Sequence, residues 1–360
     1  MPKRFDVGGQ AVIEGVMMRS PRSFAVVCRR PSGEIVIKED AWQPIWKGFK
    51  PLRWPFLRGT IVLLESLWNG ISALSFAAEQ QAITSESPKP RSLGARAARE
   101  PSDPSPTGNQ APSSGSGQDE VQLTWLAKLG MIGTSILFAL LLFVGAPHLV
   151  AWGLGTVLGF DATSFWFHAV DGVVKLAILI GYLAAISLIP EIRRVFQYHG
   201  AEHKSIFTYE KDLPLTLENA RIQSRFHPRC GTSFLLIVIM VSVVLFAALL
   251  RGKMAEPPML DHLAKIIIKV PLMFPVAGVA YELIKLTGRF AESSPLARAV
   301  AAPGMWLQAI TTREPSDDQL EIALISIRKT LWRERMGDTA GPPGGIEVFS
   351  STAEIDLPLF

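Results

Sequence analysis

Four long apolar stretches constrain this chain more than any other feature. They lie roughly over 126–150, 173–190, 232–250 and 265–286, and each approaches the ~20 residues that an α-helix needs to cross the hydrocarbon core of a membrane. Hydrophobic residues make up 48% of the 360 residues and charged residues only 19%. This balance is too apolar for an ordinary soluble domain. We therefore expect a mainly α-helical, polytopic membrane protein with about four transmembrane helices.

The basic residues predict how these helices are oriented. The connection over 151–171 contains neither lysine nor arginine, whereas the connection over 191–231 is rich in both. Because basic residues are retained on the cytoplasmic side, we expect both termini and the 191–231 connection to be cytoplasmic. The net charge of +4 then reflects topology and attraction to headgroups, so membrane lipids are expected partners and nucleic acid is not.

The first 53 residues have the pattern of a small β region. Strands are expected over 10–18, 23–30 and 33–39, and a Pro-Ser-Gly turn makes a hairpin of the last two. No apolar segment follows the N-terminal methionine, so we do not expect a cleavable signal peptide.

Residues 54–82 place apolar side chains at helical spacing, interrupted by Arg58, Glu65 and Asn69. We expect an amphipathic helix that lies on the membrane surface or packs against the bundle. The even number of spans that the predicted orientation requires argues against its crossing the bilayer.

Two further segments complete the chain. Residues 83–125, rich in Pro, Ser and Gly, are expected to form a disordered linker. Near the C-terminus, Ser316 is a good N-cap and Gly337 ends the pattern of a helix, which we expect to dock on the cytoplasmic side before a loose tail from Asp338. The expected division is a β region over 1–53, a surface helix over 54–82, a linker over 83–125, transmembrane pairs over 126–190 and 232–290 on either side of a cytosolic loop over 191–231, and a cytosolic segment over 291–360.

Four imidazole and thiol groups in the 191–231 connection have the spacing of a metal site. His199 and His203 are four residues apart, which puts them on one face of a helix. His227 and Cys230 form a second pair, with a proline and a glycine that allow a tight turn. Borderline-soft divalent metals favour neutral imidazole and thiolate ligands. The sequence therefore predicts a divalent metal, with Zn²⁺ favoured, held by these four residues.

Glu202 completes the pattern His-x-x-Glu-His, the inverted order of the zincin helix, and two functions stay open. If one ligand position is left to water, Glu202 is the general base of a hydrolase that acts on a lipid-linked or peptide substrate at the cytoplasmic face. If four protein ligands close the site, the metal only rigidifies the loop of a membrane scaffold or assembly factor. Glu202 also lies close enough to the ligand face to coordinate the ion itself.

Three more charged residues are candidates for an extra ligand or for a group that supports the ligands. Glu14 lies in an apolar surround, and a strand-edge charge without a role at the metal is the favoured interpretation. Glu282 is a third ligand, a partner of Arg193 or Arg194, or a carboxylate at the membrane interface. Arg229 is suited to hold an anionic headgroup near the metal, although retention of basic residues on the cytoplasmic side alone explains most residues of this kind.

The remaining ionisable groups of the apolar regions receive a structural interpretation. His148, His168 and His262 are expected to be ordinary interfacial residues, and Asp171 and Lys175 to form an ion pair at the start of the second span. Because the spans carry few interior charges and show no pair of broken helices, a transporter ranks third. With only two cysteines in the chain, a disulfide framework is not expected.

Several blocks of sequence resemble the YqhQ-like family of bacterial membrane proteins. The blocks lie over 7–19, 198–204, 227–232, 281–283, 303–308 and 311–315. The resemblance spans nearly the whole chain, with a linker longer than the family usually has. The family is a domain of unknown function described as a metal-dependent enzyme. The resemblance implies a location in the bacterial cytoplasmic membrane and a site at the His/Glu/His/Cys cluster, and it names no substrate.

Overall fold

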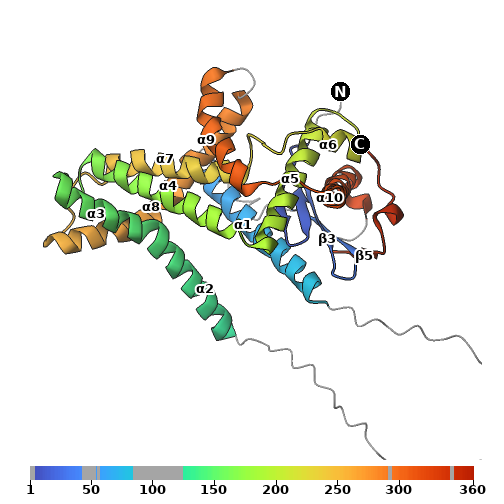
Figure 1. Ribbon diagram of the computed structural model, residues 1–360, viewed down its shortest axis with the longest axis horizontal. Helices are drawn as coiled ribbons and strands as arrows, with labels where there is room; N and C mark the ends of the chain where they lie inside the picture. Colours follow the sequence, from blue (N-terminus) through green and yellow to red (C-terminus); the bar gives the residue numbers. More distant parts are fainter. Residues whose placement is uncertain (1–4, 43–53, 55–56, 84–124, 291–293, 341–343) are drawn as a thin grey trace, which may run out of the picture. The chain divides into compact units, whose positions relative to one another are not determined.

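The protein is mainly helical and carries one small sheet near its N-terminus (Figure 1). The computed structural model describes residues 5–42, 54, 57–83, 125–290, 294–340 and 344–360. The helices are α1 (Leu57–Ala82), α2 (Trp125–Leu140), the π-helix η2 (Leu141–Gly145), α3 (Ala146–Leu158), α4 (Phe165–Ile186), α5 (Pro190–Glu210), α6 (Leu217–Arg221), α7 (Gly231–Leu249), α8 (Pro258–Phe290), α9 (Pro295–Thr311) and α10 (Asp317–Met336). The linker expected to be disordered falls almost entirely outside the described residues.

Among the described residues, five helices are long and apolar enough to cross a membrane. Four of them, Gly133–Leu158, Phe165–Ile186, Gly231–Leu249 and Pro258–Thr287, correspond to the four expected spans. The class predicted from the sequence, a mainly helical polytopic membrane protein, is confirmed. The expected connection over 151–171 is wrong in extent. Helix α3 continues to Leu158, and the Ser164 hydroxyl caps α4 by accepting from the Trp166 amide at 3.2 Å.

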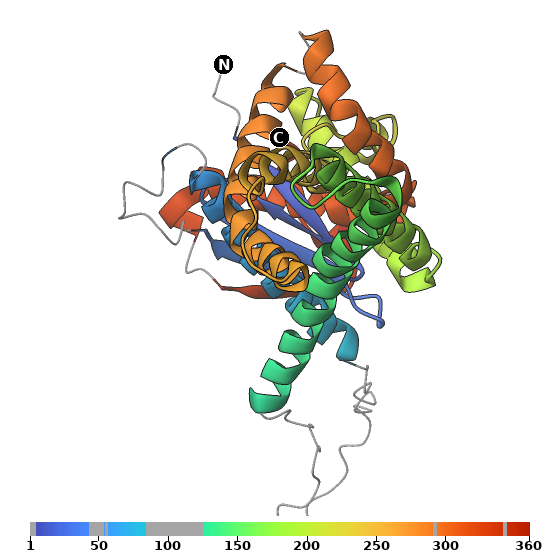
Figure 2. The same cartoon turned by 90° about the vertical axis from the view of Figure 1, so that its left-hand side faces the viewer.

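Helices α3, α4, α7 and α8 pack side by side, and Figure 2 looks onto the end of these helices where α7 is joined to α8. Large apolar side chains of α7 meet small and branched ones of α8, which lets the two helices approach closely. Ile237, Val241 and Phe246 of α7 pack with Val276 and Ala280 of α8. Helix α9 lies against the N-terminal part of α7, and a Cβ at Gly304 would come within 2.5 Å of Ser233.

Two of the three histidines expected at the interface are instead found inside this bundle, while His262 is partly exposed. His148 and His168 are 0% and 1% exposed, and Asp171 and Lys175 are buried with them. That expectation was wrong because a sequence window places a polar group along a helix without showing what packs over it. The expectation that the spans carry few interior charges is wrong for the same reason, since Asp171, Lys175, Lys265 and Lys269 are buried in the bundle.

Helix α1 connects the bundle to the sheet, which agrees with one of its two expected positions. Its first turns lie on α8, where Arg58 binds Glu282 and the Thr60 hydroxyl donates to the Phe274 carbonyl at 2.9 Å. Its last turns lie on the sheet, where the apolar face containing Phe76 packs and Gln81 donates to the Arg29 carbonyl at 2.6 Å. By length and composition α1 qualifies as a fifth span, although one face of its C-terminal part packs on the sheet.

The sheet has five antiparallel strands in the order β1-β2-β3-β4-β5. The strands are β1 (Gly8–Val12), β2 (Gly15–Arg19), β3 (Ser23–Arg29), β4 (Ile35–Ala41) and β5 (Ile346–Phe349). The single strand expected over 10–18 is two strands, because the chain reverses at Glu14, whose φ is +50°. The C-terminal tail, expected to be loose, supplies β5, which pairs with β4.

Alternating side chains of the sheet point to its two faces, which are covered by different helices. Val16, Met18 and Val27 pack toward α10 and α5, whereas Val12, Met17 and Val26 pack toward α1. The C-terminal helix begins and ends as expected, with a capping box at Ser316 and a C-cap at Gly337. It is a core element rather than a peripheral docking helix, since it packs on β2, β3 and α5.

Candidate metal centre

Helix α5 presents two imidazole rings from one face. His199 and His203 lie one turn apart, and their ring centroids are 4.5 Å apart. A proline at the first helical position and the packing of Tyr198 and Ala201 against the sheet favour helix here. The helical spacing predicted from the sequence is confirmed.

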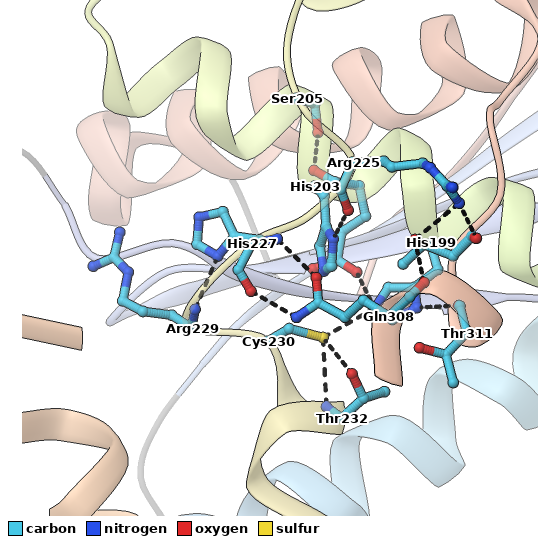
Figure 3. A network of polar contacts seen from close by, with 12 residues as sticks. His199, His203, Ser205, Arg225, His227, Arg229, Cys230, Thr232, Gln308 and Thr311 are labelled. Carbon is cyan, nitrogen blue, oxygen red and sulfur yellow. Dashed lines mark hydrogen bonds and ion pairs between the residues drawn. The ribbon is translucent and has the colours of Figure 1, made fainter. Parts of the chain in front are cut away.

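Backbone carbonyls fix the orientation of both rings (Figure 3). The Nδ1 atom of His199 donates to the carbonyl of Thr311 at 2.8 Å, and that of His203 donates to the carbonyl of Arg225 at 2.5 Å. A carbonyl oxygen can only accept, so each Nδ1 carries a proton, and in the neutral ring the lone pair is on Nε2. This is the arrangement by which a protein prepares a histidine to bind a metal through Nε2.

Cys230 completes a group of three donors. One potential ligand atom each from His199, His203 and Cys230 lies within 4.8 Å of the other two. The Cys230 Sγ is 3.2 Å from His199 Nε2 and accepts from the Thr232 amide at 3.4 Å as the N-cap of α7. The sulfur therefore lies at the N-terminus of α7, the end of a helix that carries a partial positive charge.

The protonation of His203 suits a metal ligand. Its ring is 1% exposed, and its Nε2 has no hydrogen-bond partner. Burial lowers the pKa of His203, and the nearby Cys230 opposes this only in part. The neutral imidazole is therefore favoured, and its buried lone pair points into the group with no protein donor to satisfy it.

Glu202 lies beside the three donors and is itself buried. Its Oε2 is 3.9 Å from His199 Nε2. Burial raises the pKa of Glu202, against the effects of His199, His227 and a hydrogen bond from the Gly9 amide. A Cβ at Gly9 would lie 2.8 Å from the Glu202 Cγ, so a glycine is required for β1 to approach the carboxylate this closely.

His227, expected as a ligand, is not one of the three donors. Its Nδ1 accepts from the Arg229 amide at 3.3 Å and its Nε2 donates to Glu210 at 3.2 Å, so both ring nitrogens are engaged. Figure 3 shows the ring turned toward Arg229. Gln308 holds the His227 backbone by accepting from its amide and donating to its carbonyl, both at 2.8 Å.

The three supporting candidates have other partners. Glu14 forms an ion pair with Arg194 and accepts from the Tyr198 hydroxyl at 3.3 Å, which ties the β1–β2 turn to α5. Glu282 is bound by both ends of the Arg58 fork at 2.6 Å, so the two expected roles at the metal or with Arg193 or Arg194 are not seen. Arg229 pairs with Glu210 of α5.

Sequence reasoning missed the residues that orient the ligands. The carbonyls of Thr311 and Arg225 act through the backbone, which no side-chain pattern can reveal. The only hint of these contacts in the sequence is Gly200, since a Cβ there would lie 2.1 Å from the Arg313 carbonyl. This glycine lets the segment after α9 lie on α5, which brings the Thr311 carbonyl to His199.

Comparison with known proteins identifies the family. Residues 54–333, which include all three donors, match the family of proteins of unknown function DUF1385. The chain belongs to this family. It is also 32% identical over 337 residues to the uncharacterized protein YqhQ of Bacillus subtilis (strain 168), a match that covers 93% of this chain and 95% of the relative. No solved structure matches the chain. Membership of DUF1385 agrees with the resemblance seen in the sequence and assigns no activity.

Proposed function

We propose that the protein is a metal-dependent hydrolytic enzyme whose divalent ion, with zinc favoured, is held by His199, His203 and Cys230. The observation that carries the proposal is the pair of carbonyl contacts that turn both Nε2 lone pairs toward Cys230. Catalytic zinc sites have three protein ligands drawn from imidazole, thiolate and carboxylate groups, and the fourth position is left to water or substrate. The donor types and the unsatisfied His203 Nε2 therefore fit a zinc ion.

The residues around the donors have separate tasks. When bound, a divalent ion supplies a Lewis acid that lowers the pKa of a coordinated water and polarises a substrate carbonyl. Glu202 accepts a proton on its carboxylate from the attacking water and returns it to the leaving group. Burial raises the pKa of this carboxyl, which makes it a better proton acceptor than an exposed glutamate. The Gly9 amide holds the carboxylate in place.

The place of the centre in the fold favours a substrate at a membrane surface. Cys230 caps the first turn of α7, a helix of membrane-spanning length and composition. The donors therefore lie at one end of the apolar helices, where a lipid-linked molecule or a membrane-bound peptide is within reach. With the basic 191–231 segment on the cytoplasmic side, the centre faces the inner leaflet of the bacterial cytoplasmic membrane and both termini are cytoplasmic.

An activated ester tests the catalytic part of the proposal without knowledge of the substrate. Zinc-loaded protein in lipid nanodiscs is expected to hydrolyse p-nitrophenyl acetate, and Glu202→Gln to reduce the rate by roughly 10²-fold or more while zinc content stays unchanged. Glu191→Gln, an exposed glutamate in the first turn of the same helix, is the matched control and should keep the full rate. Equal rates for the Glu202→Gln variant and the wild type would contradict a role as proton acceptor.

A structural metal in a membrane scaffold or assembly factor is the second candidate. It is favoured by one observation, the 5.6 Å separation of the His203 and His227 ring centroids. A rotation of His227 away from Glu210 would supply a fourth nitrogen and close the site. In that case His227→Ala lowers zinc affinity as much as His203→Ala does, and wild-type protein hydrolyses the ester no faster than metal-free protein.

A further inference from the structure

A second polar cluster lies inside the helical bundle, on elements other than those of the metal centre. Eight ionisable residues of α3, α4 and α8 gather there, and most of them are buried. They are His148, His168, Asp171, Lys175, Asp261, His262, Lys265 and Lys269. Ionisable groups in the apolar part of a membrane protein are costly to bury, and they mark ion or proton pathways by default.

Five of these side chains form an unbroken hydrogen-bonded chain. His262 Nδ1 is 3.0 Å from His148 Nε2, and His148 Nδ1 is 3.0 Å from Lys269 Nζ. Lys269 Nζ donates to Asp171 Oδ2 at 3.1 Å, and Lys175 Nζ donates to the same oxygen at 2.5 Å. The chain crosses three helices, so no single element holds it together.

The donors and acceptors along the chain run in one direction. An ammonium group cannot accept a hydrogen bond, so the protonated Lys269 must donate to His148 Nδ1. The proton of His148 then lies on Nε2, from which it donates to His262 Nδ1. Every contact from Lys269 to His262 is thus aligned for a proton to pass outward along it.

The charges of the cluster do not balance while every lysine is protonated. Lys175, Lys265 and Lys269 face the two carboxylates of Asp171 and Asp261. An uncompensated buried charge is strongly unfavourable. Loss of one proton makes the cluster neutral, and Lys269 is the lysine that contacts the imidazole chain.

The hydrogen-bonded chain of side chains begins near one end of the bundle and reaches toward its middle. His262 lies in the second turn of α8, where it is partly exposed, whereas Lys269 lies 11 residues from the first residue of that helix. At about 1.5 Å per residue this is roughly 16 Å of helix, about half the thickness of a bilayer core. The rings of Phe167 and Phe246 lie 5.8 and 5.5 Å from Lys269 Nζ, and all three side chains are buried.

The other elements packed around the chain add few charges. Helix α7 and the π-helix η2 contain no ionisable residue. Asp161, in the connection between α3 and α4, is exposed within electrostatic range of Lys265. Inside the cluster, Asp171 Oδ1 and both ring nitrogens of His168 are buried without a hydrogen-bond partner, so each is available to a proton or a water molecule.

We propose that the side chains of His262, His148 and Lys269 form a proton-transfer path that connects the α7–α8 end of the bundle to one exchangeable proton in its middle. In the transfer, the Lys269 N–H bond breaks as His148 Nδ1 gains the proton. The His148 Nε2–H bond breaks as His262 Nδ1 gains a proton, and the partly exposed His262 releases its own proton from Nε2 to a water molecule. Lys269 ends as a neutral amine, held by Asp171.

Nitrogen-15 NMR of the full-length protein in lipid bilayers tests the path directly. With lysine and histidine labelled, one Nζ resonance is expected to change from ammonium to amine between about pH 5 and pH 10. The ring nitrogens of His148 should shift in the same step. Lys269→Arg is expected to abolish the lysine transition, because a guanidinium keeps its proton throughout this range while its positive charge preserves the pairing with Asp171.

Two further variants make the outcome decisive. Lys253→Met removes an exposed lysine that pairs with Glu256, and it should leave the transition unchanged. His148→Phe should leave Lys269 titratable but slow its exchange with solvent at least roughly tenfold, since the link to His262 is gone. A Lys269 signal that stays ammonium over the whole range, or that exchanges equally fast without His148, would overturn the proposal. Neither result bears on the metal centre.

Discussion

At the scale of single residues, the proposed metal centre depends on which nitrogen of each histidine carries the proton. Two backbone carbonyls place that proton on Nδ1 of His199 and His203, whereas His227 has its Nε2 bound to Glu210. Three histidines that look equivalent in the sequence therefore differ in their chemistry. Only the first two present a lone pair to Cys230.

If the proposed ligand set is right, the zinc content of variants will distinguish these histidines. His203→Ala and Cys230→Ser each remove a ligand and are expected to lower zinc affinity by more than the roughly 10–100-fold that the loss of an orienting partner costs. His227→Ala is expected to keep about one zinc per chain, because His227 orients the loop and does not bind the ion. Metal analysis of the purified variants by mass spectrometry checks this. Retention of zinc by Cys230→Ser would contradict the ligand assignment.

At the scale of elements, the centre is assembled by close approach of three helices. Helix α5 supplies the imidazoles, the N-terminus of α7 supplies the thiol, and the end of α9 supplies the Thr311 carbonyl. Gly200 permits the last of these contacts because it has no side chain on the surface that meets Arg313.

Gly200→Ala is expected to destabilise the protein by about 1–3 kcal/mol, since a new Cβ meets the Arg313 backbone and cannot move aside. It should also lower zinc affinity by separating Thr311 from His199. The matched control is Gly181→Ala in α4, where a new Cβ would have nothing within 4 Å. Because alanine favours helix more than glycine does, this substitution should leave the stability unchanged or raise it. Thermal unfolding of both variants measures the difference. An unchanged melting temperature for Gly200→Ala would count against the tight contact.

The elements show what the sequence could and could not predict. The four spans, the helical face with His199 and His203, and the capped helix after Ser316 follow from local periodicity and capping, which are properties of neighbouring residues. Strand β5 was missed because it is only four residues long and gains its stability from pairing with β4, some 300 residues away in the chain. The carbonyl acceptors of the metal centre are long-range backbone contacts, and a sequence pattern carries no trace of them.

At the scale of the whole molecule, the C-terminal tail adds the edge strand β5 to the sheet. Ile355 packs into the core formed by the sheet, α5 and α10, while Ile346 in β5 is 55% exposed. Ile355→Ala is expected to cost about 2–5 kcal/mol of unfolding free energy. Ile346→Ala, the same change in the same tail, should stay within about 0.5 kcal/mol. Chemical denaturation followed by tryptophan fluorescence compares them, and equal costs would mean that the tail does not belong to the core.

The two clusters of ionisable residues lie in different parts of the protein. The donors of the metal centre lie where α5 and α7 meet, at the end of the apolar helices. The hydrogen-bonded lysine and histidine chain lies among α3, α4 and α8. Helix α7 runs from the first cluster to the second, with Cys230 at its N-terminus and Phe246 against Lys269 near its C-terminus.

X-ray absorption spectroscopy of the zinc-loaded, full-length protein tests the metal centre most directly, because it counts the atoms bound to the ion. We expect one sulfur at about 2.3 Å and two imidazole nitrogens at about 2.0–2.1 Å, with a light atom from water as the fourth ligand. The sulfur should disappear in Cys230→Ser and the shell should stay the same in His227→Ala. A shell without sulfur, or one that loses a nitrogen when His227 is replaced, would contradict the account.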